Sequence, residues 1–63
     1  MEQVIICRAK FLMFHYGKDM DESIEQAIEE VGDKEQLIDL YRLYDMTKQD
    51  YVKYIKRKMR GEL

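Results

Sequence analysis

The stretch DMDESIEQAIEEVG, residues 19–32, carries the clearest structural signal in the chain. Its apolar residues recur every three or four positions, which is the spacing of one face of an α-helix. They are Met20, Ile24, Ala27, Ile28 and Val31. Asp19 precedes the pattern as a candidate N-cap, with Glu22 three residues later as in a capping box. Gly32 follows it, where glycine often ends a helix in the left-handed conformation. The stretch therefore predicts a helix over residues 20–31.

Similar start and stop signals divide the rest of the chain. Gly17 stands where a first helix would end, and Asp33 with Gln36 resembles a second capping box. Thr47 and Asp50 form a T-x-x-D start before the last apolar pattern. The sequence therefore predicts one all-α domain over residues 1–63, a small bundle of about four short helices. The predicted ranges are 3–16, 20–31, 34–45 and 48–60.

The first segment carries two groups of apolar residues. In a helix, one group would face the core and consists of Ile5, Ile6, Ala9, Leu12, Met13 and Tyr16. The other group would lie elsewhere on the helix and consists of Val4, Cys7, Phe11 and Phe14. A strand is the alternative, because alternate residues from Ile5 to Met13 are also apolar, and valine, isoleucine and phenylalanine favour strands. Segment length and the stop at Gly17 favour the helix.

Composition limits the class of protein. A domain of 63 residues buries only about 60% of its unfolded surface, so self-association is a common source of added stability. Cys7 is the single cysteine, which excludes an intrachain disulfide and suits a reducing cytoplasm. No apolar run approaches the ~20 residues of a membrane span, and no signal-peptide pattern is present. We therefore expect a cytoplasmic protein without a membrane contact.

Residues suited to catalysis or metal binding are few. Cys7 and His15 are the only soft metal ligands, whereas a structural zinc site normally has four ligands. In a helix these two residues lie two turns apart, about 12 Å along the axis, too far to act as nucleophile and base. The chain has no glycine-rich phosphate loop. We therefore expect no enzyme activity, no metal and no cofactor.

Charge is unevenly distributed along the chain. Residues 1–18 hold one acid and three bases, residues 19–39 nine acids and one base, and residues 40–63 three acids and seven bases. Such asymmetry can orient a partner or a second copy, although solvated helix faces are the simpler explanation. Four bases in the last segment fall within an arc of about 100° opposite the apolar residues. This basic ridge consists of Lys53, Lys56, Arg57 and Arg60. It is a candidate contact for an acidic protein or for phosphates, or simply complements the helix dipole.

Residues 37–60 resemble the short C-terminal helical hairpins of many bacterial proteins, the SHOCT type. The likeness rests on Leu37–Tyr44, a turn with Met46-Thr47, and then Asp50-Tyr51 followed by a Lys/Arg-rich helix. It covers under half of the chain, and Tyr44-Asp45 replaces the glycine that usually precedes the turn. The resemblance implies an assembly or recruitment module.

These observations favour a small non-enzymatic protein–protein interaction or regulatory module of bacterial, phage or mobile-element type. We expect a homodimer, because the second apolar group of the first segment would otherwise stay exposed, and pairing two copies would bury it. A DNA-binding transcriptional regulator is the alternative. It would be either a helix-turn-helix around Gly32 or a ribbon-helix-helix-like dimer in which residues 4–14 form a strand presenting Arg8 and Lys10.

Overall fold

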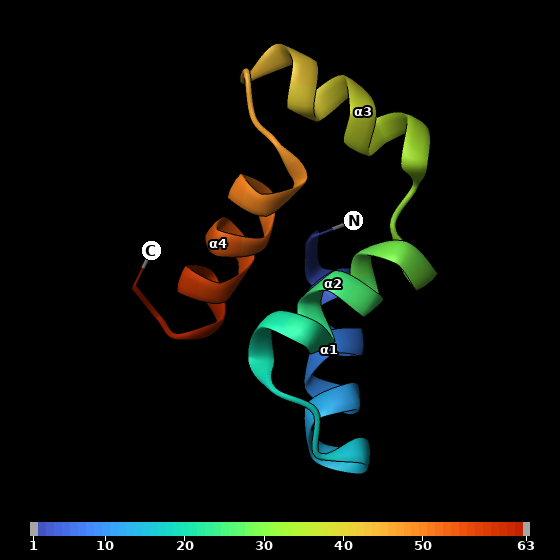
Figure 1. Cartoon of the computed structure of the whole chain (residues 1–63), viewed down its shortest axis with the longest axis vertical. Helices are drawn as coiled ribbons and strands as arrows, with labels where there is room; N and C mark the ends of the chain where they lie inside the picture. Colours follow the sequence, from blue (N-terminus) through green and yellow to red (C-terminus); the bar gives the residue numbers. More distant parts are fainter. Residues whose placement is uncertain (1, 63) are drawn as a thin grey trace.

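The computed structural model describes residues 2–62, and this range contains four α-helices and no strand (Figure 1). They are α1 (Glu2–Tyr16), α2 (Met20–Val31), α3 (Lys34–Leu43) and α4 (Lys48–Met59). The predicted all-α fold is confirmed, and the strand alternative for the first segment is wrong. The bounds of α2 are those predicted, whereas α3 ends two residues before the predicted end at residue 45.

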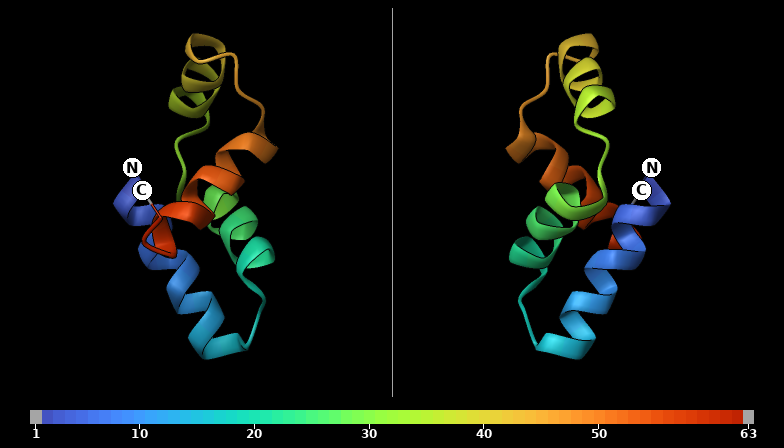
Figure 2. Two further views of the ribbon diagram at one scale, coloured as in Figure 1. Left: turned by 90° about the vertical axis from the view of Figure 1, so that its left-hand side faces the viewer. Right: turned by 90° about the vertical axis from the view of Figure 1, so that its right-hand side faces the viewer.

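The core lies where α1, α2 and α4 meet. Helices α1 and α2 form an antiparallel hairpin, α4 packs across it, and α3 stands apart at the other end of the molecule (Figures 1 and 2). The buried apolar residues come mainly from the first, second and fourth helices: Ile5, Ile6, Ala9, Leu12, Ile24, Ala27, Ile28, Leu37, Tyr51, Val52 and Ile55. Leu37 is the only buried residue of α3. This helix is therefore held mostly by its two ends and by half-buried side chains.

Small residues allow α1 and α2 to pack closely. Ala9, Ser23 and Ala27 are all completely buried in this hairpin. The apolar pattern of α2 predicted Val31 in the core instead of Ser23, but Val31 is 37% exposed. The Ser23 hydroxyl has no hydrogen-bond partner among residues 2–62. A serine fits this position by size, because a larger side chain would push the two helices apart.

The connections between helices use two backbone conformations, left-handed at Gly17 and Asp45 and extended at Gly32. Gly17 ends α1 with φ of 66°, which confirms the predicted left-handed stop. Gly32 was predicted in the same conformation, and that prediction is wrong, because its φ is −74°. The glycine is needed for space: a Cβ at Gly32 would lie 2.5 Å from the carbonyl oxygen of Ile28 and 2.8 Å from Cδ1 of Leu37. Asp45 takes the left-handed position after α3, with φ of 50°, and this ends the helix early.

Side chains cap the starts of the last three helices. The Asp19 carboxylate accepts a hydrogen bond from the Glu22 amide at 2.8 Å, and Asp33 caps α3 in the same way. At α4 the box is complete. The Thr47 hydroxyl accepts from the Asp50 amide at 3.2 Å, and the Asp50 carboxylate accepts from the Thr47 amide at 3.1 Å. At each of these predicted helix starts, a side chain therefore accepts hydrogen bonds from backbone amides that have no partner within the helix.

Thr47→Ala should lower the free energy of unfolding by about 1 kcal/mol, because it removes the oxygen that accepts from the Asp50 amide. Thr47→Ser keeps that oxygen and is the matched control. Urea unfolding followed by circular dichroism measures both. Equal stability of the alanine and serine variants would contradict a stabilising cap. The backbone and side chain of Thr47 also hold the pKa of Asp50 below its ordinary 3.8, so the box should persist at neutral pH and weaken only as the pH falls below that value.

No helix in the described range has both the length and the apolar character needed to cross a membrane.

Candidate interaction surfaces

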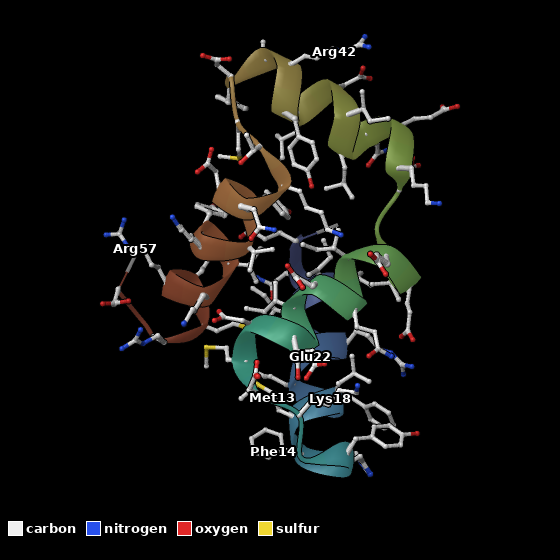
Figure 3. The ribbon with its side chains drawn as sticks, in the orientation of Figure 1. Met13, Phe14, Lys18, Glu22, Arg42 and Arg57 are labelled. Atoms are coloured by element: carbon white, nitrogen blue, oxygen red, sulfur yellow. The ribbon has the colours of Figure 1, made fainter. Side chains whose placement is uncertain are left out.

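The outer face of α1 consists of Val4, Cys7, Phe11 and Phe14, and all four side chains are exposed. Phe14 is 82% exposed and Phe11 38%. In Figure 3, Phe14 lies at the end of α1 farthest from α3. The opposite side of the same helix supplies Ile5, Ala9 and Leu12 to the core. The two apolar groups predicted in the first segment therefore lie on opposite faces. The core group was predicted too broadly, because Tyr16 is 66% exposed and Met13 is only half-buried beyond the last buried residue, Leu12.

The spacing of the outer face is that of a helix-pairing seam. Its residues alternate at intervals of three and four positions, as do the a and d positions of a coiled coil. A strip with this period stays on one side of the helix from Val4 to Phe14, which is most of the length of α1. Scattered exposed apolar residues need no explanation, but a continuous strip along one helix does.

Bases and aromatic rings flank this face, and the rings of His15 and Tyr16 both contact that of Phe11. The His15 ring lies 4.2 Å from that of Phe11, and the Arg8 guanidinium sits 4.9 Å above the Phe11 ring. Arg8 is also held by α2, because its Nε donates to the Glu30 carboxylate at 2.7 Å. Hydrogen bonds from Gln26 and Arg8 hold the pKa of Glu30 below its ordinary value. The ring of Phe11 thus packs between Arg8 and His15 on the exposed side of α1.

The basic ridge of α4 is only partly free. Lys53, Arg57 and Arg60 are exposed, and Arg57 points away from the helices in Figure 3. Lys56 is half-buried and pairs with Asp21 of α2, with 3.1 Å between the ammonium and the carboxylate. Lys56 therefore supports the packing of α4 on α2. A role for the other three in partner binding remains a prediction.

Several acidic residues of α2 form ion pairs with bases of other helices, so much of the uneven charge of the sequence is neutralised within the chain. Two acids of α2, Asp21 and Glu29, face bases of α4, and the pair of Glu29 with Lys48 measures 2.9 Å. Exposed pairs of this kind contribute about 0–1 kcal/mol each, so they orient the helices more than they stabilise them. Among residues 2–62, Lys53 and Arg57 form no ion pair. These two bases remain available to a partner.

A groove between α3, α4 and the start of α1 was not predicted from the sequence. We call it the tyrosine groove; its volume is about 510 Å³ and its lining residues are Glu2, Leu40, Tyr44, Met46, Tyr51 and Tyr54. Tyr51 is buried, and its ring meets those of Tyr41 and Tyr54 at 5.9 and 6.1 Å. Tyr44 is largely exposed at the rim. The turn that joins α3 and α4 sets the two helices at an angle (Figure 1), and the groove lies between them.

One carboxylate lies in this groove, and it is compensated. The Tyr54 hydroxyl donates to Glu2 at 3.0 Å, and the Lys58 ammonium bonds the other carboxylate oxygen. Lys58 is the main reason that the pKa of Glu2 is below its ordinary value. These contacts join the first and last helices across 56 positions of sequence. They also leave the groove without net charge.

Within the described range, no three His, Cys, Asp or Glu side chains gather as metal ligands. Comparison of the chain with family models, curated proteins and solved structures gives no significant match. The likeness of residues 37–60 to SHOCT hairpins is therefore not supported by a family match. The exposed surfaces themselves are the basis for assigning a function.

Proposed function

We propose that this protein is a small cytoplasmic protein–protein interaction module that assembles as a homodimer through the outer face of α1. One observation carries the proposal: an apolar strip with coiled-coil spacing lies exposed directly opposite the core face of the same helix. A second copy offers the same strip, so a two-fold pairing would cover both at once. The single cysteine lies within the strip, and its reduced form suits a cytoplasmic location.

The size of the strip sets the expected affinity. A helix of 15 residues is about 22 Å long. One such helix face offers less surface than the roughly 800 Å² per partner of a standard stable interface. We therefore expect a dissociation constant in the micromolar range, with monomer and dimer exchanging rapidly.

Charge around the strip predicts how the dimer responds to salt. Arg8, Lys10 and His15 flank the strip, and Glu30 compensates Arg8 alone. Pairing two copies brings like charges together, so the association must come from apolar contact. Because salt screens that repulsion, the dimer should persist or become tighter as ionic strength rises. An association driven by opposite charges would weaken instead.

Phe14→Glu should convert the dimer to a folded monomer, raising the dissociation constant by about tenfold or more, because burying a carboxylate in an apolar interface is unfavourable. The substitution should leave the monomer fold intact, because Phe14 is 82% exposed. Leu43→Glu is the matched control, since Leu43 is 76% exposed on α3, away from the strip. Sedimentation equilibrium and circular dichroism report assembly and folding. A wild type that stays monomeric at high micromolar concentration, or equal effects of the two variants, would contradict the proposal.

No specific observation favours DNA binding as a second candidate. The ribbon-helix-helix version requires a strand at residues 4–14, and these residues are helical. In the helix-turn-helix version α3 would enter the groove of DNA, but its exposed side mixes acids and bases with two apolar residues. The residues concerned are Lys34, Glu35, Asp39, Arg42, Ile38 and Leu43.

A further inference from the structure

We infer that self-association through the outer face of α1 is controlled by pH, and that His15 is the group that responds. The dimer forms while His15 is neutral and weakens when His15 is protonated. This inference rests on the proposed homodimer and adds its regulation. The chain has a single histidine, and histidine is the side chain whose charge ordinarily changes between about pH 5 and pH 8. A pH change in this range therefore acts on one place at the surface.

His15 lies directly beside the apolar strip. Its ring is 4.2 Å from that of Phe11, and its side chain is exposed in the monomer. In the heptad register of the strip, Phe11 occupies an a position and Phe14 a d position, so His15 occupies the e position. Side chains at e positions lie along the edge of a helix pair, where they meet the flanking residues of the other helix. Pairing two copies therefore brings the His15 ring close to the second copy.

The residues that His15 meets are basic in either arrangement of the pair. Arg8 is the other base at an e position, and Lys10 occupies the g position on the opposite edge of the strip. In a parallel pair an e position faces a g position, so His15 faces Lys10 of the second copy. In an antiparallel pair e positions share an edge, so His15 shares one with Arg8 of the second copy. Two-fold symmetry repeats this repulsion on both sides of the pair when the histidines are protonated.

The acids around His15 are engaged elsewhere or form no contact with it. Among residues 2–62, His15 forms no ion pair. In the turn after α1, Lys18 adds a positive charge, and the Asp19 carboxylate caps α2. On α2, Glu30 is paired with a base of α1, and the Glu22 side chain forms no hydrogen bond or ion pair within residues 2–62. The last helix hydrogen-bonds α1 at its first residue, at the opposite end from His15.

The direction of the pH effect follows from the difference between monomer and dimer. His15 lies in the last turn of α1 with solvent around it, and a helix C-terminus favours cations, so the monomer accommodates the proton. In the dimer the proton would add a charge beside an apolar contact and a base, which is unfavourable. Dimerisation therefore releases protons, and by linkage the dissociation constant rises as the pH falls.

The net charge of the chain changes in the opposite sense. It is −2 with His15 neutral, and one added proton makes it −1. General repulsion between two copies therefore becomes weaker at lower pH and by itself would favour association. A dimer that weakens as the pH falls thus reports a local effect at the interface.

Sedimentation equilibrium at about pH 8 and about pH 5.5 tests the switch with the full chain. The dissociation constant of the wild type should be about five- to twentyfold higher at the lower pH, as expected for two repulsive exposed pairs. This ratio should shrink in about 1 M salt, which screens such charges. Circular dichroism at both pH values checks that the monomer stays folded. A dimer that is equally strong or stronger at the lower pH would overturn the switch alone. A monomer at both pH values would refute the homodimer and the switch together.

His15→Gln and His15→Lys fix the charge at this position. Glutamine is neutral at both pH values, so the dissociation constant of His15→Gln should differ by less than about twofold between them. Lysine is positive at both, so His15→Lys should associate at the higher pH as weakly as the wild type does at the lower. Both substitutions lie at an exposed position and should leave the fold intact. If His15→Gln keeps the pH dependence of the wild type, another group is responsible and the inference is wrong.

The double variant Arg8→Gln with Lys10→Gln removes both candidate opposing bases. It should reduce the pH dependence of the dissociation constant to less than about twofold. Of the two single variants, Lys10→Gln should account for the loss in a parallel pair and Arg8→Gln in an antiparallel pair. Full pH dependence in the double variant would show that neither base opposes His15, and would overturn the switch assigned here.

Discussion

Ile55→Ala should leave most of the protein unfolded, or close to unfolding, at room temperature. Ile55 is completely buried on α4 and packs into the core formed with α1 and α2. Removing a buried isoleucine side chain to Cβ lowers the free energy of unfolding by about 2–5 kcal/mol, with the larger values where the surroundings cannot collapse. The whole domain is expected to have only about 3–9 kcal/mol, from typical values per residue. One substitution therefore removes a large part of its stability.

Ile38→Ala is the matched control for this prediction. It is the same chemical change on α3, where Ile38 is 48% exposed, and it should lower the free energy of unfolding by less than about 1 kcal/mol. The melting temperature should fall by about 20 °C for Ile55→Ala and by only a few degrees for Ile38→Ala. Thermal unfolding by circular dichroism measures both. Similar losses in the two variants would show that α4 does not pack through Ile55.

Gly32→Ala should destabilise the protein by about 2–3 kcal/mol. The added methyl group would meet the carbonyl oxygen of Ile28 at 2.5 Å and Cδ1 of Leu37 at 2.8 Å. The Leu37 side chain can move, but the carbonyl belongs to the last turn of α2 and accepts the hydrogen bond from the Gly32 amide. Relief therefore requires α3 to move away from α2, and Leu37 is the only buried residue that anchors α3.

Gly17→Ala is the control for the conformational part of this effect. A methyl group at Gly17 meets nothing within 4 Å, so the variant suffers only from its φ of 66°, at about 1 kcal/mol. Denaturant unfolding should therefore rank Gly32→Ala as clearly less stable than Gly17→Ala. The opposite order would mean that the close approach at Gly32 is not present in solution.

Local features of the fold were predictable from the sequence because they depend on neighbouring residues. A helix start needs an acceptor within three positions of the amides it satisfies, and Asp19, Asp33 and Thr47 provide one. The periodicity of α2 gave its bounds without error, because every signal in that stretch agreed. The left-handed stop at Gly17 also follows from one residue and the helix before it. Asp45 took the same conformation without being a glycine, so the end of α3 was placed too late.

A candidate surface was predictable from the sequence only where all of its residues lie on one helix. The exposed strip of α1 is visible in the sequence, since its residues lie on one helix at regular spacing. The tyrosine groove is not, because Glu2 and Tyr54 come together only through the packing of the first helix beside the last. Of the predicted basic ridge, Arg60 lies just past the end of α4, and the periodicity of one helix could not show that Lys56 faces Asp21 of another.

The sequence by itself determined the helices, their caps and the two apolar faces of α1, since each depends on contacts within a few residues. Tertiary packing decided what no single segment encodes. It buried Ser23 and left Val31 exposed, because the α1–α2 hairpin requires small side chains at its closest approach. It required glycine at position 32 for space, because the Ile28 carbonyl and the Leu37 side chain both lie close to the position that a Cβ would take. It also formed a groove between α3, α4 and the start of α1, because the core keeps α4 on α1 and α2 while α3 stands apart.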